Sequence, residues 1–455
     1  MSFRKILIAN RGEIAVRIIR ACQEMDIATV AIFSEPDRHS LHVTLADEAF
    51  CVGPSAAASS YLNVPNIISA ALVSGADGIH PGYGFLAENA GFAEICQSHG
   101  IKFIGPSPKA IDAMGNKSRA REVMREAGVP VLPGTSDLES DQEALEFAQT
   151  CGYPLLIKAT AGGGGKGMRI VSNAAELKRA LQTAQAEAQA AFGDDRVYLE
   201  KFLPRARHIE IQILADQCGQ MIHLGERDCS VQRRNQKLLE EAPSEIVTDD
   251  LRARMGDAAI RGARAVGYES AGTVEFLLDQ RDGTFYFLEM NTRIQVEHAV
   301  TEMVTGVDLV KEQIRVAAGL PLRLTQADIQ IRGHAVECRI NAENPENSFS
   351  PCTGKVERLH LPGGPGLRFD THIETDYVVA PYYDSLLGKL VACGNSREEA
   401  LSRMNRALLE LRIDGVHTTS AFLRFIVNHP LYRQNHFDTT FVETVVRPPL
   451  PVGEA

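Results

Sequence analysis

Apolar and amphipathic segments alternate at the start of the chain in a pattern typical of parallel sheets. Residues Ile6–Ala9 and Thr29–Phe33 are short apolar runs that predict buried strands, and Ile14–Met25 carries apolar positions at helical spacing. A strand, a helix and a second strand in this order predict a βαβ unit of the doubly wound kind. The turn Asn10–Glu13 lacks the GxGxxG spacing of a dinucleotide-binding loop, so we assign no cofactor to it.

A second pattern, between residues 272 and 298, predicts a hairpin. The segments Thr273–Leu278 and Thr284–Glu289 are rich in β-branched and aromatic residues, and an Asp-Gly pair at residues 282–283 suits the turn. This turn places Glu275 opposite Glu289, and opposed Cβ atoms of an antiparallel pair lie about 5 Å apart. Two carboxylates at that distance repel, so the pair needs a shared proton or a cation, and its oxygens suit Mg²⁺ or Mn²⁺.

Polar and mainly apolar residues alternate after this hairpin. One parity consists of Glu289, Asn291, Arg293, Gln295 and Glu297. Because an extended chain alternates its faces, the pattern predicts a strand with one polar row. A solvated strand face is the common alternative. Two acids, two amides and an arginine can together bind a metal, an anion and a proton, so we favour a functional row.

A glycine-rich loop joins two other predicted strands. The strand Tyr153–Ala159 contains Lys158, and the segment Gly162–Gly167 with Lys166 separates it from a strand-like pair at residues 170–171. Four consecutive glycines carry an entropic cost, which favours close approach of backbone N–H groups to a ligand. The Walker A register fails, because the loop joins strand to strand. A flexible linker is the alternative, but we favour a mobile lid over phosphate.

Basic residues gather in one further segment, residues 225–237, which holds Arg227, Arg233, Arg234 and Lys237. In an acidic chain this cluster suggests an anion site, although charge runs are often solvated. The helix that opens at Lys117 carries a cation that could meet phosphate, but a lone lysine there is more often solvated.

The segment Gly333–Asn341 alternates like a strand. The alternation puts Arg339 on one face with Glu337 and Asn341, while the other face is mostly apolar. Helices are predicted over residues 307–318, 398–411 and 418–427, and the tail from Arg447, with three prolines, is expected to fray.

Composition excludes several classes of protein. The 455 residues, 44% of them hydrophobic, allow two to four packed subdomains. An apolar run of about 18 residues and a signal peptide are both absent, so we expect a cytoplasmic protein, or a mature organellar one, without a membrane span. Nine cysteines without CxxC spacing argue against a disulfide framework and a zinc site. The net charge of -11 argues against nucleic-acid binding.

Six segments together carry a family resemblance: Ile8–Ala15, His80–Leu86, Gly162–Arg169, Arg227–Lys237, Glu289–His298 and Gly333–Asn341. From Lys5 to about Val442 the chain closely resembles biotin carboxylase, an ATP-grasp enzyme and a component of acetyl-CoA carboxylase. The resemblance implies an α/β (α+β) ATP-grasp fold. Its expected parts are a doubly wound N-terminal domain (1–115), a linker helix with a mobile lid (116–203), a C-terminal mixed-sheet domain (204–447) and a tail (448–455).

The resemblance also implies roles for residues at matching positions. The expected ATP-binding residues are Lys117, Lys158, Gly164, Gly165, Lys166, Gly167, Glu200, Lys201, Leu203, His208, Gln232 and Asn235. Two Mg²⁺ or Mn²⁺ ions are expected at Glu275, Glu289 and Asn291. Bicarbonate is expected at Lys237, Arg293, Gln295, Val296 and Glu297, and biotin at Tyr83 and Arg339. The expected catalytic residues are Glu297, Arg339, Lys237 and Arg293, and a dimer interface is expected at Arg20, Glu24 and Arg368.

The implied activity is ATP-dependent carboxylation of biotin by bicarbonate. Glu297 is expected to remove the bicarbonate proton, after which the dianion attacks the γ-phosphate to give carboxyphosphate. Carboxyphosphate releases CO₂, and Arg339 stabilises the enolate-like oxygen of biotin while N1′ attacks it. Lid closure is expected to exclude water. The acceptor is acetyl-CoA for fatty acid synthesis or, alternatively, another acyl-CoA such as propionyl-CoA.

Two residues depart from the family pattern. Asn235 stands where a histidine is common, which removes a proton-carrying group, and Pro365 stands where an aromatic residue is frequent. The chain lacks the Met-Lys-Met signature of a biotin carrier. We therefore expect a separate biotin carboxyl carrier protein, separate carboxyltransferase subunits and a homodimer.

Proteins with two other functions would not be expected to carry this full set of residues. A different ATP-grasp ligase would not need the row of Arg293, Gln295 and Glu297. A nucleotide-binding regulator would be expected to have lost at least one of the catalytic or metal-binding residues, and the chain has all of them.

Overall fold

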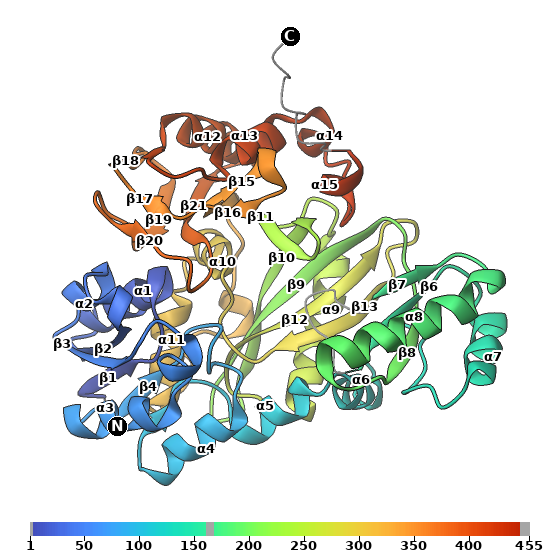
Figure 1. Cartoon of the computed structure of the whole chain (residues 1–455), viewed down its shortest axis with the longest axis horizontal. Helices are drawn as coiled ribbons and strands as arrows, with labels where there is room; N and C mark the ends of the chain where they lie inside the picture. The colour runs from blue at the N-terminus through green and yellow to red at the C-terminus, as the bar shows by residue number, and fades with distance from the viewer. Residues whose placement is uncertain (1–2, 161–167, 446–455) are drawn as a thin grey trace.

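The computed structural model describes residues 3–160 and 168–445, which fold into three parts (Figure 1). The N-terminal part, drawn in blue, contains a five-stranded sheet. The large sheet runs through the middle of the molecule and into the C-terminal region, and a small green unit projects from one side. Within the described ranges, every helix is too short or too polar to cross a membrane.

The N-terminal sheet has the strand order β3-β2-β1-β4-β5, and all of its pairings are parallel. This order, which grows outwards from β1 in both directions, confirms the predicted doubly wound start. The strands are β1 Lys5–Ile8, β2 Ala28–Ser34, β3 Glu48–Gly53, β4 Gly78–His80 and β5 Lys102–Phe103; the helices are α1 Gly12–Gln23, α2 Leu41–Leu45, α3 Val64–Ser74, α4 Ala90–Ser98 and α5 Pro108–Gly115.

The large sheet has eight strands in the order β13-β12-β9-β10-β11-β14-β21-β19. All of its described pairings are antiparallel, where a mixed sheet was expected. Short connections join β9 to β10, β10 to β11 and β12 to β13 as hairpins, which makes these three pairs antiparallel. The only parallel pairing at this edge among the described residues is an isolated bridge between Val131 and Phe287. The strands are β9 Ala206–Ala215, β10 Met221–Arg233, β11 Gln236–Ala242, β12 Ser270–Asp279, β13 Phe285–Asn291, β14 His334–Asn341, β19 Leu367–Thr371 and β21 Leu386–Gly394.

Helices cover this sheet, and three small ribbons extend it. The helices are α9 Asp249–Ala265, α10 His298–Thr305, α11 Leu309–Ala317, α12 Arg397–Glu410, α13 Ser420–Asn428, α14 Pro430–Arg433 and α15 Phe441–Thr444. The ribbons pair β15 Glu343–Asn344 with β16 Ser350–Pro351, β17 Gly354–Lys355 with β20 Val378–Val379, and β18 Arg358–His360 with β22 Arg412–Asp414.

The side-chain period of two separates a core face from a polar face in the large sheet. On β9 the isoleucines at positions 209, 211 and 213 pack with α9, while His208, Glu210 and Gln212 alternate with them. On β14, Val336, Cys338 and Ile340 pack against α12 and α13. Arg339 takes the opposite parity, as the sequence predicted. The apolar faces thus carry the cores, and buried polar groups gather on the other side.

The third part contains a three-stranded sheet with the order β7-β6-β8, flanked by two helices. Its elements, with the preceding linker helix, are α6 Lys117–Glu126, α7 Asp141–Cys151, β6 Leu155–Ala159, β7 Arg169–Val171, α8 Ala174–Phe192 and β8 Val197–Lys201. The antiparallel pairing of β6 with β7 confirms that the glycine run joins strand to strand. Residues 161–167, which include Gly164, Gly165, Lys166 and Gly167, lie outside the described residues.

The predicted hairpin forms, but the predicted strand beyond it is too long. Glu275 and Glu289 are direct partners across β12 and β13, as expected. The strand ends at Asn291, so its predicted extension to Glu297 is wrong. The Thr292 N–H donates to the Glu88 carboxylate at 3.0 Å, and residues 292–297 turn directly into α10. The Glu88 side chain thus accepts the hydrogen bond that the Thr292 N–H would donate to a neighbouring strand if β13 continued.

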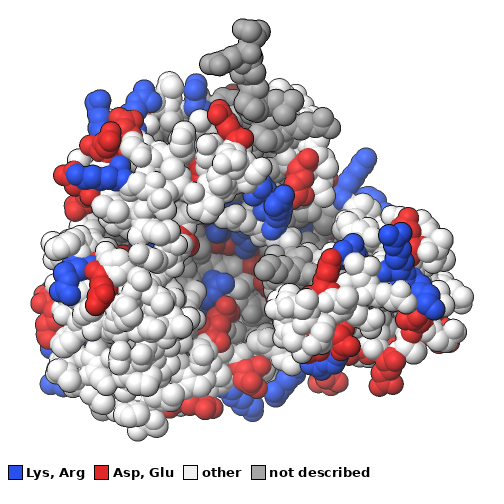
Figure 2. Space-filling view, in the orientation of Figure 1, with Lys and Arg blue, Asp and Glu red and all other residues white. Residues whose placement is uncertain are grey.

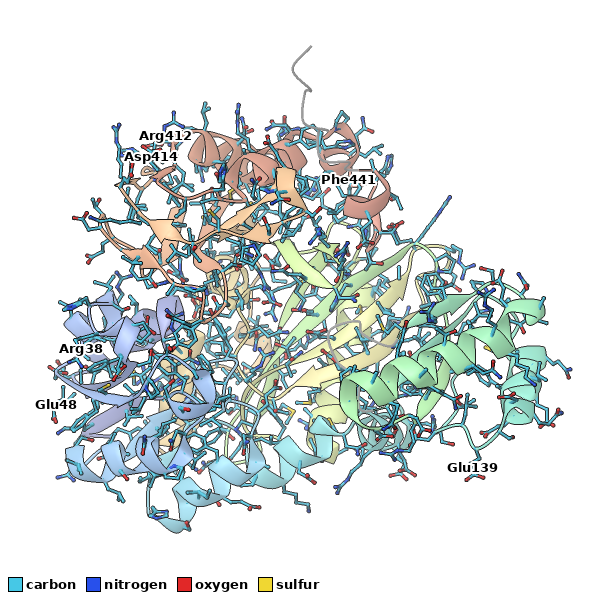
Figure 3. All side chains as sticks on the ribbon, in the orientation of Figure 1. Arg38, Glu48, Glu139, Arg412, Asp414 and Phe441 are labelled. Atoms are coloured by element: carbon cyan, nitrogen blue, oxygen red, sulfur yellow. The ribbon has the colours of Figure 1, made fainter. Side chains whose placement is uncertain are left out.

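A buried polar cluster joins the N-terminal part to the C-terminal region. Arg11 binds Asp37 through two hydrogen bonds of 2.6 and 2.8 Å, and Tyr61 donates to the same carboxylate at 2.6 Å. The Arg11 guanidinium lies 4.4 Å from the ring centroid of Tyr383, whose hydroxyl donates to Ser34. By contrast Arg38 and Glu48, labelled in Figure 3, lie on the outer side of the N-terminal part.

We predict that Asp37→Asn lowers the free energy of unfolding at pH 7 by about 2 kcal/mol. Burial raises the pKa of Asp37, but the Arg11 guanidinium and the Tyr61 hydroxyl outweigh it and lower this pKa to about 2. A lowered pKa gives stability that is present above the unfolded-state pKa and is lost as pH falls towards 2. Thermal unfolding of both proteins between pH 7 and 2.5 should therefore show the difference shrinking below about pH 4. Glu35→Gln, an exposed change nearby, is the control, and a pH-independent difference would contradict the assignment.

Candidate active site

A cavity of about 700 Å³ opens between the small sheet, the large sheet and the turn that joins β10 to β11. Figure 2 shows a hollow in the middle of the molecule with basic and acidic side chains on its floor. Of the residues with predicted roles, those that line the cavity are Lys117, Lys158, Glu200, Lys201, Leu203, His208, Gln232, Asn235, Lys237, Glu275, Glu289, Asn291, Arg293, Gln295, Val296, Glu297 and Arg339. One cavity thus brings together residues more than 200 positions apart in the chain.

The Lys237 ammonium lies among three buried carboxylates. It is 2.7 Å from Glu297 and 3.1 Å from Glu275, and it also donates to Glu210. Burial lowers the pKa of Lys237, but the three carboxylates outweigh burial and raise it well above its ordinary value. The lysine therefore stays charged in a buried site, which only close opposite charges allow.

Glu297 lies between two cations. Its second oxygen is 2.9 Å from Arg339, whose Nε donates to Glu240 at 2.6 Å. Burial raises the pKa of Glu297, but Lys237, Arg339 and Arg227 outweigh burial, so this pKa falls well below its ordinary value. Glu297 is therefore ionised at neutral pH. Its basicity depends on how tightly these cations hold it.

The donor set at Glu275 and Glu289 fits a divalent cation. Glu275 accepts hydrogen bonds from His208 and Asn291, each at 2.8 Å, and from Gln295 at 2.7 Å. Burial and the Glu275 carboxylate raise the pKa of Glu289. A cation between the two carboxylates would remove this repulsion, and oxygen ligands are those that Mg²⁺ prefers.

The loop of residues 292–297 is held at both ends. Arg293 donates from Nε to Glu88 at 2.9 Å and from Nη2 to Asn291 at 2.9 Å. The Gln295 side chain accepts a hydrogen bond from the fully buried Arg227 at 2.5 Å. Although the strand prediction failed here, its polar side chains still meet in the cavity.

At the nucleotide end, Glu200 pairs with Lys158 at 2.5 Å and also with Arg121. The Lys201 ammonium donates to three backbone carbonyls at the end of α7, at 3.1–3.2 Å. These hydrogen bonds direct the ammonium towards the small unit itself. Lys158 and Lys117 both line this part of the cavity wall, where an ammonium group can meet phosphate.

Residues 439–443, among the last described residues, form another wall of the cavity. Thr439, Thr440 and Glu443 line it, and the Arg234 N–H donates to Glu443 at 2.7 Å. Arg234 and the neighbouring Asn235 form the β10–β11 turn, both with positive φ, so α15 holds this turn in place. Figure 3 labels Phe441 on this helix.

Among the described residues, four with predicted roles lie outside the cavity lining. Tyr83 is half-buried and donates to Glu13. Arg20 and Glu24 are exposed at the end of α1, and Arg368 binds Glu302 and Asp370, at 2.7 and 2.6 Å. Their proposed roles at the biotin site and the dimer interface stay predictions.

Three family models match the chain in order. The biotin carboxylase N-terminal domain matches residues 2–111, the ATP-binding domain of the carbamoyl-phosphate synthase L chain matches residues 116–325, and the biotin carboxylase C-terminal domain matches residues 337–444. A biotin carboxylase of Nostoc sp. is 60% identical over 444 residues, which cover 97% of this chain and 99% of the relative. The chain belongs to the biotin carboxylase family. It is an ATP-dependent ligase.

Two solved biotin carboxylases show the same fold. The Campylobacter jejuni biotin carboxylase, solved as a β-γ-ATP complex, is 46% identical with a TM-score of 0.93, covering 97% of this chain and 99% of that one. The biotin carboxylase domain of the Hydrogenobacter thermophilus 2-oxoglutarate carboxylase is 50% identical with a TM-score of 0.92, covering 97% and 98%. That domain was solved as a dimer with MgADP, ADP and bicarbonate. Biotin carboxylases with different acceptors thus share this architecture.

Sequence reasoning about this biotin carboxylase missed several residues beside the cavity. Glu210 binds Lys237 and Arg227, Glu240 binds Arg339, and Glu88 binds Arg293. A signal existed for Glu210, since His208, Glu210 and Gln212 interrupt the isoleucines of a central strand at alternate positions. Glu88 gave no local signal, because its partner lies 205 residues away.

We predict that Glu289→Gln weakens divalent-metal binding by this biotin carboxylase on the order of 100-fold, because the site loses one of its two carboxylates. Mn²⁺ titration followed by electron paramagnetic resonance, in the presence of nucleotide, measures this directly. Glu126→Gln, an exposed change at the end of α6, is the control. Equal Mn²⁺ affinity in all three proteins would remove Glu289 from the metal site.

Proposed function

We propose that the enzyme carboxylates biotin carried on a separate protein, as the first half-reaction of an acetyl-CoA carboxylase. The observation that carries the proposal is the ionised Glu297 between Lys237 and Arg339, in the same cavity as a carboxylate pair suited to a metal. A base, an anion-binding cation and a metal site within one cavity suit the activation of bicarbonate by ATP.

In the first step bicarbonate binds beside Lys237, Arg293, Gln295 and Val296, and Glu297 accepts its proton. Bicarbonate draws Lys237 and Arg293 towards its own charge, which raises the pKa of Glu297 from its lowered value and strengthens the base. A carbonate oxygen then attacks the γ-phosphorus of ATP, and ADP leaves as carboxyphosphate forms.

The nucleotide lies across the cavity between the small sheet and β12–β13. Lys117 and Lys158 contact the phosphates, while Glu200, Lys201, Leu203, His208, Gln232 and Asn235 surround adenine and ribose. Glu275, Glu289 and Asn291 would hold two Mg²⁺ or Mn²⁺ ions, which would neutralise charge at the phosphates. Asn235 acts there as a hydrogen-bonding amide, because it cannot carry a proton.

In the second step carboxyphosphate releases CO₂ and phosphate, and the phosphate takes the N1′ proton of biotin. Arg339 lies beside the ureido oxygen, where negative charge develops while N1′ attacks CO₂. Tyr83 lies on the biotin side, close enough for the Arg339 charge to affect its pKa.

The assembly that we propose has three components. A biotin carboxyl carrier protein delivers biotin, carboxyltransferase subunits use it, and the enzyme itself dimerises through Arg20, Glu24 and Arg368. The domain limits at residues 115, 203 and 447 and the cytoplasmic location stay predictions. Propionyl-CoA or another acyl-CoA is the alternative acceptor. The fold alone does not select the acceptor, since the biotin carboxylase domain of a 2-oxoglutarate carboxylase shares it.

We predict that bicarbonate stimulates ATP hydrolysis by the purified enzyme, that free biotin stimulates it further, and that Glu297→Gln lowers this stimulated rate on the order of 10³-fold. The amide cannot accept the bicarbonate proton. Glu94→Gln, an exposed change on α4, is the control. ATP turnover that requires a different carboxylate and an amine would instead identify another ATP-grasp ligase.

We predict that Arg339→Lys separates the two steps. Lysine keeps the positive charge beside Glu297 but loses the planar fork that binds Glu297 and Glu240 together. The stimulation by biotin should fall on the order of 100-fold, while ATP hydrolysis with bicarbonate alone falls less than about tenfold. A parallel loss of both rates would contradict a role of Arg339 at biotin.

A further inference from the structure

A second buried lysine lies behind the loop that contains Glu297. Lys389, on β21, is fully buried, and its ammonium donates to the backbone carbonyl of Val296 at 2.8 Å. The same ammonium is 3.2 Å from Glu13, which lies on α1 of the N-terminal part. The Lys389 Nζ atom, carried by the large sheet, thus contacts both the loop and the N-terminal part.

The sheet register places Lys389 directly beside Arg339 on the same face of the sheet, because opposed residues of an antiparallel pair point to the same side. Its Cα partner on β14 is Arg339, and its Cα partner on β19 is Asp370. Arg339 contacts Glu297 from the cavity side, whereas Lys389 contacts the carbonyl of the preceding residue. Two neighbouring cations of one sheet therefore hold the two sides of the same loop.

Charge balance alone does not require the contact with Val296. Burial lowers the pKa of Lys389, but Glu13, Glu337 and Asp370 outweigh burial and raise it. Both oxygens of Glu337 are buried without a hydrogen-bond partner among the described residues, and burial raises the pKa of Glu337 well above its ordinary value. The ammonium is nevertheless closer to the carbonyl, at 2.8 Å, than to Glu13 at 3.2 Å or Asp370 at 3.9 Å.

The carbonyl of Val296 shares its peptide group with the N–H of Glu297. An ammonium bound to this oxygen fixes the orientation of the peptide at the point where the loop enters α10. Glu88 holds the other end of the loop through Thr292 and Arg293. Both ends are therefore held from outside the loop: Glu88 binds one end directly, and Glu13 is linked to the other end only through Lys389.

We propose that Lys389 is the positioning residue of the bicarbonate site: by binding the Val296 carbonyl it sets the peptide from which Glu297 projects. Through Glu13, Lys389 also holds the Tyr83 hydroxyl. One ammonium thus positions a residue at the proposed bicarbonate site and a residue at the proposed biotin site. The inference rests on the proposed bicarbonate site.

The alternative is that Lys389 only balances buried charge. Lys389→Met and the double variant Glu13→Gln/Lys389→Met separate the two. The single variant leaves Glu13 without its cation, which costs stability, whereas the double variant removes both charges and should recover most of the lost Tm. Neither variant can hold the Val296 carbonyl.

The experiment measures KM for bicarbonate, KM for ATP, kcat and Tm in the wild type and both variants. We expect the double variant to show a KM for bicarbonate raised about tenfold and a kcat lowered on the order of 10- to 100-fold, with KM for ATP changed less than about twofold. Arg397→Met is the control. It breaks a buried ion pair with Glu241, neither residue of which lines the cavity, and it should lower Tm without changing the ratio of the two KM values.

Wild-type kinetics for bicarbonate in the double variant would overturn the inference, as would a parallel rise of both KM values. If Lys389→Met does not fold, the double variant decides alone. If neither variant folds, Lys389 is structural and the proposal fails. Absence of bicarbonate-dependent turnover in the wild type would instead overturn the proposed function itself.

Discussion

The arrangement of this enzyme depends on one constraint: three carboxylates and an ammonium are buried together at Lys237. Each charge would be costly without the others, so the strands that carry them must stay in register. Lys237 comes from β11, Glu210 from β9, Glu275 from β12 and Glu297 from the start of α10. The large antiparallel sheet supplies this register, since each strand contributes its polar parity to the same side.

One face of the large sheet packs into the hydrophobic core, and the other face carries the polar residues beside the cavity. The isoleucines of β9 and the apolar row of β14 pack against helices, and polar residues of the same strands contact one another beside the cavity. Because neighbouring side chains on a strand point to opposite faces, a substitution in one row leaves the other in place. A dense polar cluster can therefore sit on a well-packed core.

Patterns with a short range were predictable, and contacts across the chain were not. The opposition of Glu275 and Glu289 followed from turn chemistry, and the parity of Arg339 followed from the period of two. The polar row after Glu289 was assigned to one long strand because polar and apolar residues alternate along it. The same alternation can occur in a loop, so the pattern could not show where the strand ends. The strand ends at Asn291, where the next N–H donates to Glu88, about 200 residues earlier in the chain. The local sequence carries no signal for this contact. The roles of the nucleotide-binding residues came from the family resemblance and not from spacing.

The last described residues have a consequence for how the protein is made. Thr439, Thr440 and Glu443 form part of the cavity wall, and Arg207 binds Asn435 just before them. A chain emerging from the ribosome exposes its N-terminal part and most of the large sheet before this segment is synthesised. The cavity is thus completed only after residue 443 has been synthesised, so a chain that terminates before this residue lacks part of the cavity wall.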